Sequence, residues 1–305
     1  MSTRANQLFA SAAALLALVS LSAVAEDSPA PLGALVDVGG YRVHLYCAGD
    51  ANPTVMVVGA GFSFDWALVQ PDVAKFSRVC TYDPAGFAWS DPGPGMGCAD
   101  RVDEIHNLLK HAGVDGPYVL AGLSIGGLVA RLYAARYPDE VAGMVIVDHA
   151  FLNPAGEGSS RASNSRPDLD SPPVLISQTP INLTVEDIAH FENLPPRSRS
   201  LHRWAMSLHP ALPTVETAER CVADVDAATH NRTQPLGAMP LAVVSTPNGS
   251  PNYPKQQAML LSLSRNRNQF MAENSFHAVE IDQPDVVIRA IHQVVDAVRN
   301  KSRMR

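Results

Sequence analysis

A strand passes directly into a helix at residues 117–137, which read PYVLAGLSIGGLVARLYAARY. The apolar run Tyr118–Ala121 predicts the strand, and an amphipathic helix is predicted after Gly-Leu-Ser-Ile-Gly. Only five residues reverse the chain, so Gly122 and Gly126 must be small to let the strand and the helix approach each other. This junction requires a sheet with a helix packed on it, and it exposes the Ser124 hydroxyl at the end of a strand.

Similar apolar runs recur along the chain and alternate with helical patterns. Most are continuous and rich in β-branched residues, as in strands that are buried on both faces. The remaining predicted strands cover residues 36–38, 41–47, 54–58, 78–82, 143–147 and 241–245, and residues 101–112 and 283–299 have helical periodicity. The alternation predicts an α/β fold with a mostly parallel sheet and helices on both faces.

One long segment interrupts this alternation. Residues 153–173 are rich in Ser, Pro, Gly and Arg, and helical patterns follow at 185–193, 197–207 and 215–229. We expect a helical cap insertion over residues 153–235, placed between two parts of the core at 26–152 and 236–305.

The first 25 residues predict a signal peptide. Arg4 precedes an apolar stretch over residues 8–21, and Ala23-Val24-Ala25 has the small residues that a signal peptidase recognises. An uncleaved N-terminal anchor is the alternative. Export to the periplasm or the medium would permit disulfides. The four cysteines, Cys47, Cys80, Cys98 and Cys221, allow three complete pairings, and the sequence does not choose among them.

Composition excludes several classes of protein. The 305 residues are 46% hydrophobic and 17% charged, which argues against global disorder. A net charge of −7 gives no basic surface for nucleic acid. No apolar run after residue 30 is long enough for a membrane span, so none is expected once the signal is cleaved. Motifs for a dinucleotide, a phosphate loop or a metal are missing from the sequence, and we expect no cofactor or metal.

The strand, the Gly-Leu-Ser-Ile-Gly turn and the helix form a nucleophile elbow. The chain resembles the α/β-hydrolase superfamily from about residue 36 to 300. The resemblance implies an eight-stranded, mostly parallel sheet with a cap. It also implies a serine nucleophile at Ser124, an acid after a later strand, and a histidine after the last strand.

The resemblance also implies an oxyanion hole made of two backbone N–H groups. One is the N–H of Ile125, at the start of the helix. The other is expected in the loop Gly59–Phe62, and we assign it to Phe62. The family commonly has His-Gly here, whereas this chain has Ala60-Gly61, and a simple glycine turn is the alternative.

His277 is the expected catalytic base. It follows the last strand and precedes the helix that begins near Asp282-Gln283-Pro284, which is where the family places its histidine. The other nine histidines lie elsewhere, and His149 is expected to be structural.

The triad acid departs from the common pattern. The loop after residues 241–245 lacks a carboxylate, because no Asp or Glu occurs between Asp226 and Glu273. Asp148, at the end of the preceding strand, is the better candidate, since some haloalkane dehalogenases of the superfamily place their acid there. Glu273 is a weaker alternative. Asp83 is expected to shape a turn.

Aromatic residues near strand ends suggest a substrate pocket, to which we assign Phe64, Trp66 and Phe276. The sequence thus predicts an exported serine hydrolase that cleaves small-molecule carboxylic esters through an acyl-enzyme. A peptidase, a cofactor-free haloperoxidase, a carbon–carbon bond hydrolase, an acyltransferase and a catalytically silent binding protein remain open, as does the oligomeric state.

Overall fold

A computed structural model of the chain describes residues 28–59, 61–95, 97–149, 189–229, 232, 234–247 and 252–304. The chain divides into two units, Met1–Pro31 and Leu32–Arg305, and the second contains every element below. The predicted signal peptide and residues 153–173 lie outside the described residues.

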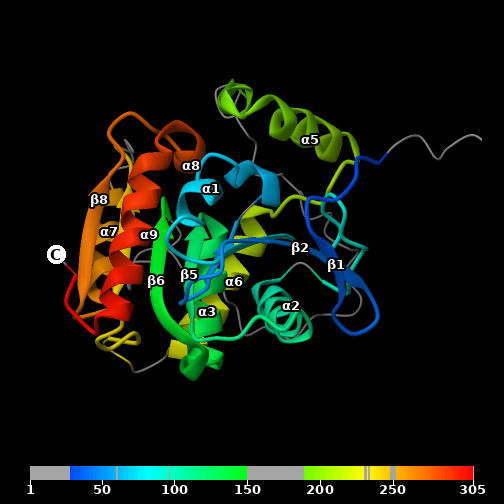
Figure 1. Ribbon diagram of the computed structural model, residues 1–305. Helices are drawn as coiled ribbons and strands as arrows, with labels where there is room; N and C mark the ends of the chain where they lie inside the picture. Colours follow the sequence, from blue (N-terminus) through cyan, green and yellow to red (C-terminus); the bar gives the residue numbers. More distant parts are fainter. Residues whose placement is uncertain are drawn as a thin grey trace, which may run out of the picture. The chain divides into compact units, whose positions relative to one another are not determined.

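The second unit is built on one eight-stranded sheet (Figure 1). Its spatial order is β1-β2-β4-β3-β5-β6-β7-β8. The pairs β1–β2 and β2–β4 are antiparallel, and all other pairs are parallel. The strands are β1 Ala34–Asp37, β2 Arg42–Ala48, β3 Val55–Val58, β4 Val79–Asp83, β5 Tyr118–Leu123, β6 Val141–Val147, β7 Leu241–Ser245 and β8 Arg267–Met271. The predicted mostly parallel sheet is confirmed.

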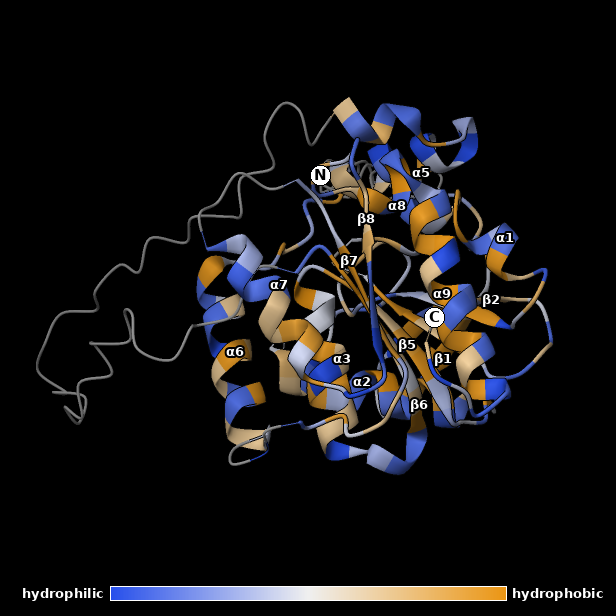
Figure 2. Ribbon diagram, turned by 90° about the vertical axis from the view of Figure 1, so that its left-hand side faces the viewer, coloured by the Kyte–Doolittle hydropathy of each residue, from blue (hydrophilic) through white to orange (hydrophobic). Residues whose placement is uncertain are grey.

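Helices cover both faces of the sheet because its inner strands are hydrophobic on both sides (Figure 2). One apolar layer lies under α2 (Cys98–His111), α3 (Ile125–Arg136), α6 (Val215–Thr229) and α7 (Tyr253–Ser262). The other lies under α1 (Gln70–Val73), α8 (Val279–Asp282) and α9 (Pro284–Arg299). Successive strand residues point into opposite layers. Met56, for example, lies in the layer under α2 and α3, and Val57 lies in the layer under α9.

The helix after the elbow differs from its prediction. We expected α3 to be amphipathic, but residues 125–134 are all buried. The reason is that α3 contacts the sheet strands on one side and α2 and α6 on the other. A helix enclosed in this way has no solvent-exposed polar face, and Arg131 is the one charged residue among residues 125–134.

The predicted cap region divides between two places. α6 packs against α2 and α3 in the core layer. α5 (Pro196–Ser207) instead contacts η1 (Ser63–Trp66), a 3₁₀ helix after β3, and η3 (Phe191–Asn193), a 3₁₀ turn within the predicted helix at 185–193. α5 and η3 therefore lie next to the loops that follow the strands, where α/β enzymes bind ligands.

Close packing at the elbow explains both of its glycines. A Cβ atom on Gly126 would lie 1.8 Å from the Val58 carbonyl oxygen, and one on Gly122 would lie 2.5 Å from the Gly126 carbonyl oxygen. Any side chain at either position would push the helix away from the sheet.

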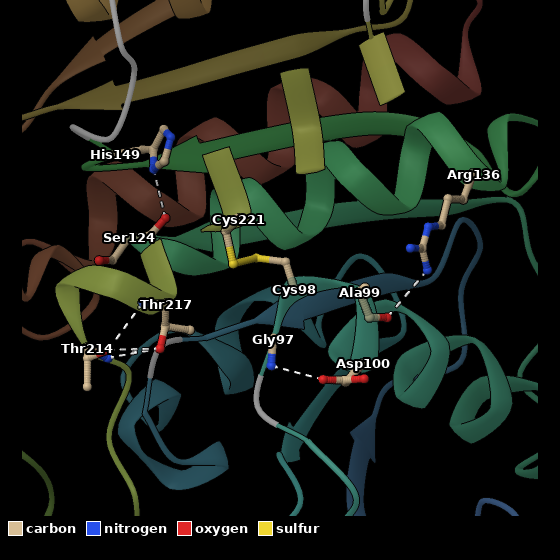
Figure 3. The surroundings of a disulfide bond; sticks show 10 residues. All are labelled: Gly97, Cys98, Ala99, Asp100, Ser124, Arg136, His149, Thr214, Thr217 and Cys221. Carbon is tan, nitrogen blue, oxygen red and sulfur yellow. Dashed lines mark hydrogen bonds between the residues drawn. A yellow bond between two sulfur atoms is a disulfide. The ribbon is translucent and has the colours of Figure 1, made fainter. Parts of the chain in front are cut away.

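The two disulfides resolve the pairing that the sequence left open. Cys47–Cys80 joins two directly paired positions of β2 and β4. Cys98–Cys221 ties the first residue of α2 to α6 (Figure 3). All four cysteines are thus bonded.

Removing the longer-range disulfide is expected to cost stability. The Cys98–Cys221 bond spans 123 residues, and a loop of this length restricts the unfolded chain strongly. The double variant Cys98→Ser/Cys221→Ser should lower the free energy of unfolding by about 3–5 kcal/mol. Urea unfolding followed by circular dichroism measures this loss, and a value below about 1 kcal/mol would contradict it.

Candidate active site

Ser124 occupies the turn between β5 and α3 in a strained conformation. Its φ and ψ angles are +54° and −125°, a region that non-glycine residues rarely adopt. Backbone hydrogen bonds hold this turn, because the Ser124 N–H donates to the Val147 carbonyl at 3.0 Å and the Gly127 N–H donates to the Ser124 carbonyl at 2.9 Å. The serine is 5% exposed and lines a cavity at the ends of the strands.

His149 also supports the elbow. Its Nδ1 lies 2.9 Å from the Ser124 carbonyl oxygen (Figure 3), and its ring is fully buried. The Gln257 side-chain amide donates to the His149 carbonyl at 2.9 Å. His149 therefore acts on the backbone of the turn, as expected for a structural residue.

His277 and Asp148 lie together although 129 residues separate them in the sequence. The His277 Nδ1 is 2.7 Å from Asp148 Oδ2. Asp148 follows β6, the neighbour of β5, and His277 lies between β8 and α8. His277 lines the same cavity as Ser124, and its side chain is 44% exposed, whereas that of Asp148 is 6% exposed. Glu273, the alternative acid, is exposed.

Two hydroxyl groups hold the second oxygen of Asp148. The Tyr253 hydroxyl donates to Oδ1 at 2.7 Å, and the Thr246 hydroxyl donates to the same atom at 2.9 Å. Burial, and after it the nearby Asp148 carboxylate, raise the pKa of Tyr253, so the phenol keeps its proton. Both oxygens of Asp148 are thus hydrogen-bonded, and these contacts fix the orientation of its carboxylate toward His277. The sequence carried no motif for these partners.

The donor predicted on the β3 loop is engaged elsewhere. The Phe62 N–H donates to Asp65 Oδ2 at 3.0 Å, so this group does not face the cavity as an unengaged oxyanion donor. The reason is local, because Phe62 immediately precedes η1 and Asp65 caps its first turn. Gly61 and Ile125 do line the cavity beside Ser124, while Ala60 lies outside the described residues.

Asp83 also holds the loop after β3, through contacts with Ser63. Its carboxylate accepts the Ser63 N–H at 2.7 Å and the Ser63 hydroxyl at 3.2 Å. The other contact is with His44 Nδ1, 2.7 Å from Asp83 Oδ2. The structural role expected for Asp83 is consistent with these contacts.

The cavity has a volume of about 120 Å³ and a mainly apolar lining. Its walls come from the β3 loop and η1, the elbow, the η3–α5 region and α8. They are formed by Gly61, Phe62, Asp65, Leu123, Ser124, Ile125, Phe191, His202, Met206, Leu212, Pro213, His277, Ala278 and Glu280.

The three aromatic residues assigned to the pocket do not line this cavity. Phe64 stacks on Phe62 with ring centroids 5.1 Å apart, and Trp66 is buried in the apolar layer under α9. Phe276 is 70% exposed. The 3₁₀ turns of η1 direct successive side chains to different sides, so proximity in sequence did not place Phe64 and Trp66 in the cavity.

A second histidine–aspartate pair lies in the cavity wall. His202 of α5 places Nδ1 2.8 Å from Asp65 Oδ1, and its ring stacks on Phe191 at 3.9 Å. Asp65 thus joins α5 to the β3 loop through its two oxygens. The sequence alone does not indicate this pair, because a histidine on a helix gives no signal of its partner.

Within the described ranges, no group of three or more His, Cys, Asp or Glu side chains is placed to hold a metal ion. None of the helices in those ranges is long and apolar enough to cross a membrane.

Sequence comparisons relate the chain to hydrolases over part of its length. Residues 55–169 match a family model described as the alpha/beta hydrolase fold. The chain is 31% identical over 140 residues to 2-hydroxymuconate semialdehyde hydrolase of Pseudomonas sp. (strain CF600), covering 44% of this chain and 49% of that protein. It is 24% identical over 267 residues to the uncharacterised protein YqjL of Bacillus subtilis (strain 168), covering 84% and 89%. A 33% identical match to an uncharacterised Schizosaccharomyces pombe protein covers 35% of this chain but only 26% of that one.

Solved structures share the fold. An esterase from Thermogutta terrifontis aligns with a TM-score of 0.58 and 17% identity, covering 87% of this chain and 97% of the esterase. A meta-cleavage product hydrolase from Pseudomonas fluorescens IP01 aligns with a TM-score of 0.60 and 17% identity, covering 88% and 98%. The sheet order, the strained serine on its elbow, the family model over residues 55–169 and these neighbours agree, and the chain has the α/β-hydrolase fold.

Proposed function

We propose that the protein is a serine hydrolase that cleaves carboxylic esters. The observation that carries the proposal is the joint placement of Ser124 and His277 in one cavity, with the His277 Nδ1 2.7 Å from Asp148. A serine nucleophile, a histidine base and an aspartate that orients the base form the minimal set for acyl transfer.

In the proposed mechanism, the Ser124 Oγ attacks the ester carbonyl while His277 Nε2 takes its proton. Asp148 holds the Nδ1–H tautomer and stabilises the imidazolium. The Ile125 N–H, at the start of α3, stabilises the tetrahedral oxyanion. We assign the second donor to the Gly61 N–H, because the N–H of Phe62 is bonded to Asp65.

Collapse of this intermediate breaks the bond to the alcohol, which leaves with the proton from His277. Water then attacks the acyl-enzyme, with His277 again as the base, and releases the acid and Ser124.

The cavity favours a small substrate group. Apolar cavities of roughly 150 Å³ hold one benzene-sized ring, so a cavity of about 120 Å³ suits an acyl or alcohol group of a few carbons. Short-chain esters are therefore the expected substrates.

A fluorophosphonate probe tests the proposal directly. The folded protein should be labelled at Ser124 and should hydrolyse p-nitrophenyl acetate and butanoate faster than the decanoate. A folded protein that the probe does not label and that hydrolyses none of these esters would instead support the silent binding protein.

Carbon–carbon bond hydrolysis is the second candidate. It is favoured by the likeness to 2-hydroxymuconate semialdehyde hydrolase, which covers about half of that enzyme. Turnover of 2-hydroxymuconate semialdehyde with a higher kcat/KM than any ester would favour this activity.

We also propose that the chain is exported, with cleavage after Ala25. The two disulfides support this, because such bonds persist mainly in oxidising compartments. Mass spectrometry of the protein from its native cell envelope and medium tests the cleavage site.

A further inference from the structure

Glu280 is a buried acidic residue in the wall of the candidate active-site cavity. It lies three residues after His277, on α8, and lines the cavity together with Ser124. The residue is 3% exposed, and its Oε2 has no hydrogen-bond partner in the part of the chain that the structure describes. Buried polar atoms in native proteins are nearly always paired, so this atom is suited to a partner that arrives with a ligand.

The surroundings of Glu280 favour its neutral form. Burial is the main cause that raises its pKa well above the usual range, and three nearby carboxylates raise it further. Each of those carboxylates contacts a histidine Nδ1. The pairs are Asp65–His202, Asp148–His277 and Asp282–His190.

Each oxygen of these three carboxylates already contacts a group of the protein. The second oxygen of Asp65 accepts the Phe62 N–H, and that of Asp282 accepts the Ser275 hydroxyl at 3.1 Å. The second oxygen of Asp148 accepts two hydroxyl groups. These oxygens are therefore engaged with donors of the protein, whereas Oε2 of Glu280 has no such donor among the described residues. A neutral acid with one O–H donor needs only one acceptor oxygen.

We propose that Glu280 determines specificity by donating a hydrogen bond from its protonated carboxyl group to a second, uncharged acceptor oxygen of the substrate, such as a keto oxygen. The inference rests on the proposed ester hydrolysis and names its substrate class as short esters that carry an oxo group. Apart from Glu280, the polar side chains of the cavity lining are those of Ser124, His277 and the His202–Asp65 pair, and the other side chains are apolar. Glu280 is therefore the group that distinguishes an oxo substituent from a methyl group of similar size.

Two matched esters test the proposal. p-Nitrophenyl 4-oxopentanoate and p-nitrophenyl 4-methylpentanoate have similar shapes and differ in the acceptor oxygen. After correction for their rates of alkaline hydrolysis, the protein should prefer the oxo ester by about tenfold in kcat/KM, as expected for one hydrogen bond.

Three variants separate the hydrogen bond from other effects. Glu280→Leu should reduce the preference to within about twofold, because it removes the donor. Glu280→Gln should keep most of the preference, because its amide N–H still donates. Glu273→Leu changes an exposed glutamate and should leave the tenfold preference unchanged. Circular dichroism checks that each variant is folded.

Several results would overturn the inference. One is an unchanged preference in Glu280→Leu, and another is complete loss of hydrolysis of both esters in that variant. A third is a wild-type preference for p-nitrophenyl 4-(trimethylammonio)butanoate that Glu280→Gln abolishes, since this shows an ionised carboxylate that binds a cation. If the wild-type protein hydrolyses no ester, the proposed function fails and this inference fails with it.

The protonated state predicts a dependence of stability on pH. In the unfolded chain Glu280 ionises above about pH 4.3, whereas in the folded protein its raised pKa keeps the proton on the carboxyl group to higher pH. The unfolded state then binds fewer protons, so this residue lowers stability as the pH rises from about 4.3 towards its folded pKa. Relative to wild type, Glu280→Gln should shift the urea midpoint upward more at pH 8 than at pH 5. An equal shift at both values would show that Glu280 is ionised in the folded protein.

Discussion

Ser124→Ala is expected to lower kcat/KM for p-nitrophenyl acetate by about 10⁴-fold or more, while the protein remains folded. The proposed reaction passes through a bond between Ser124 Oγ and the acyl carbon, and no neighbouring group replaces that oxygen. The residual rate would come from the oxyanion donors and from substrate binding alone.

Ser200→Ala provides a matched control on α5. Ser200 is exposed and has no role in the proposed mechanism, so its replacement should change kcat/KM by less than twofold. Steady-state kinetics with active-site titration measures both variants. Near-wild-type activity in Ser124→Ala would mean that another group is the nucleophile.

Asp148→Asn should lower kcat by about 10⁴-fold with the fold retained. The Tyr253 and Thr246 hydroxyls both donate to Asp148 Oδ1, so they will hold the amide oxygen of an asparagine at that position. The amide NH₂ group then faces His277 Nδ1 and donates to it. This selects the tautomer with its proton on Nε2, which cannot accept the proton of Ser124.

Glu273→Gln is the companion variant, because Glu273 is the other carboxylate considered for the triad. It should retain activity within about twofold, since the residue is exposed. A loss below tenfold in Asp148→Asn, or a large loss in Glu273→Gln, would move the acid away from Asp148. The pH profile of kcat/KM adds a second readout, because the wrong tautomer alters the titration of the base.

Local patterns were sufficient to predict most of the sheet. The inner strands are continuous apolar runs, and this signal survives without tertiary information because both of their faces are buried. β8 was not among the strands predicted from these patterns. As an edge strand with exposed positions at every second residue, it has no such run, and its sequence Arg-Asn-Gln-Phe-Met is largely polar.

The residues that line the cavity could not be predicted in the same way. Phe64, Trp66 and Phe276 were assigned from their position near strand ends, yet none of them lines it. Its distal wall comes from Phe191, His202 and Met206, in a region that the sequence described only as helical. Which face of a helix meets a distant loop depends on packing between elements far apart in the chain, and no local pattern encodes it.

The sequence by itself determined the elbow at Ser124, because the steric demands of a tight strand-to-helix turn act between neighbouring residues and leave their mark as glycines at 122 and 126. Tertiary structure alone decided the partners. It brought Asp148 and His277 within hydrogen-bond distance, used the Phe62 N–H to cap η1, and buried Glu280 beside the cavity. These outcomes depend on which strand ends are adjacent in the sheet and on how water is excluded between them, and both are properties of the assembled fold.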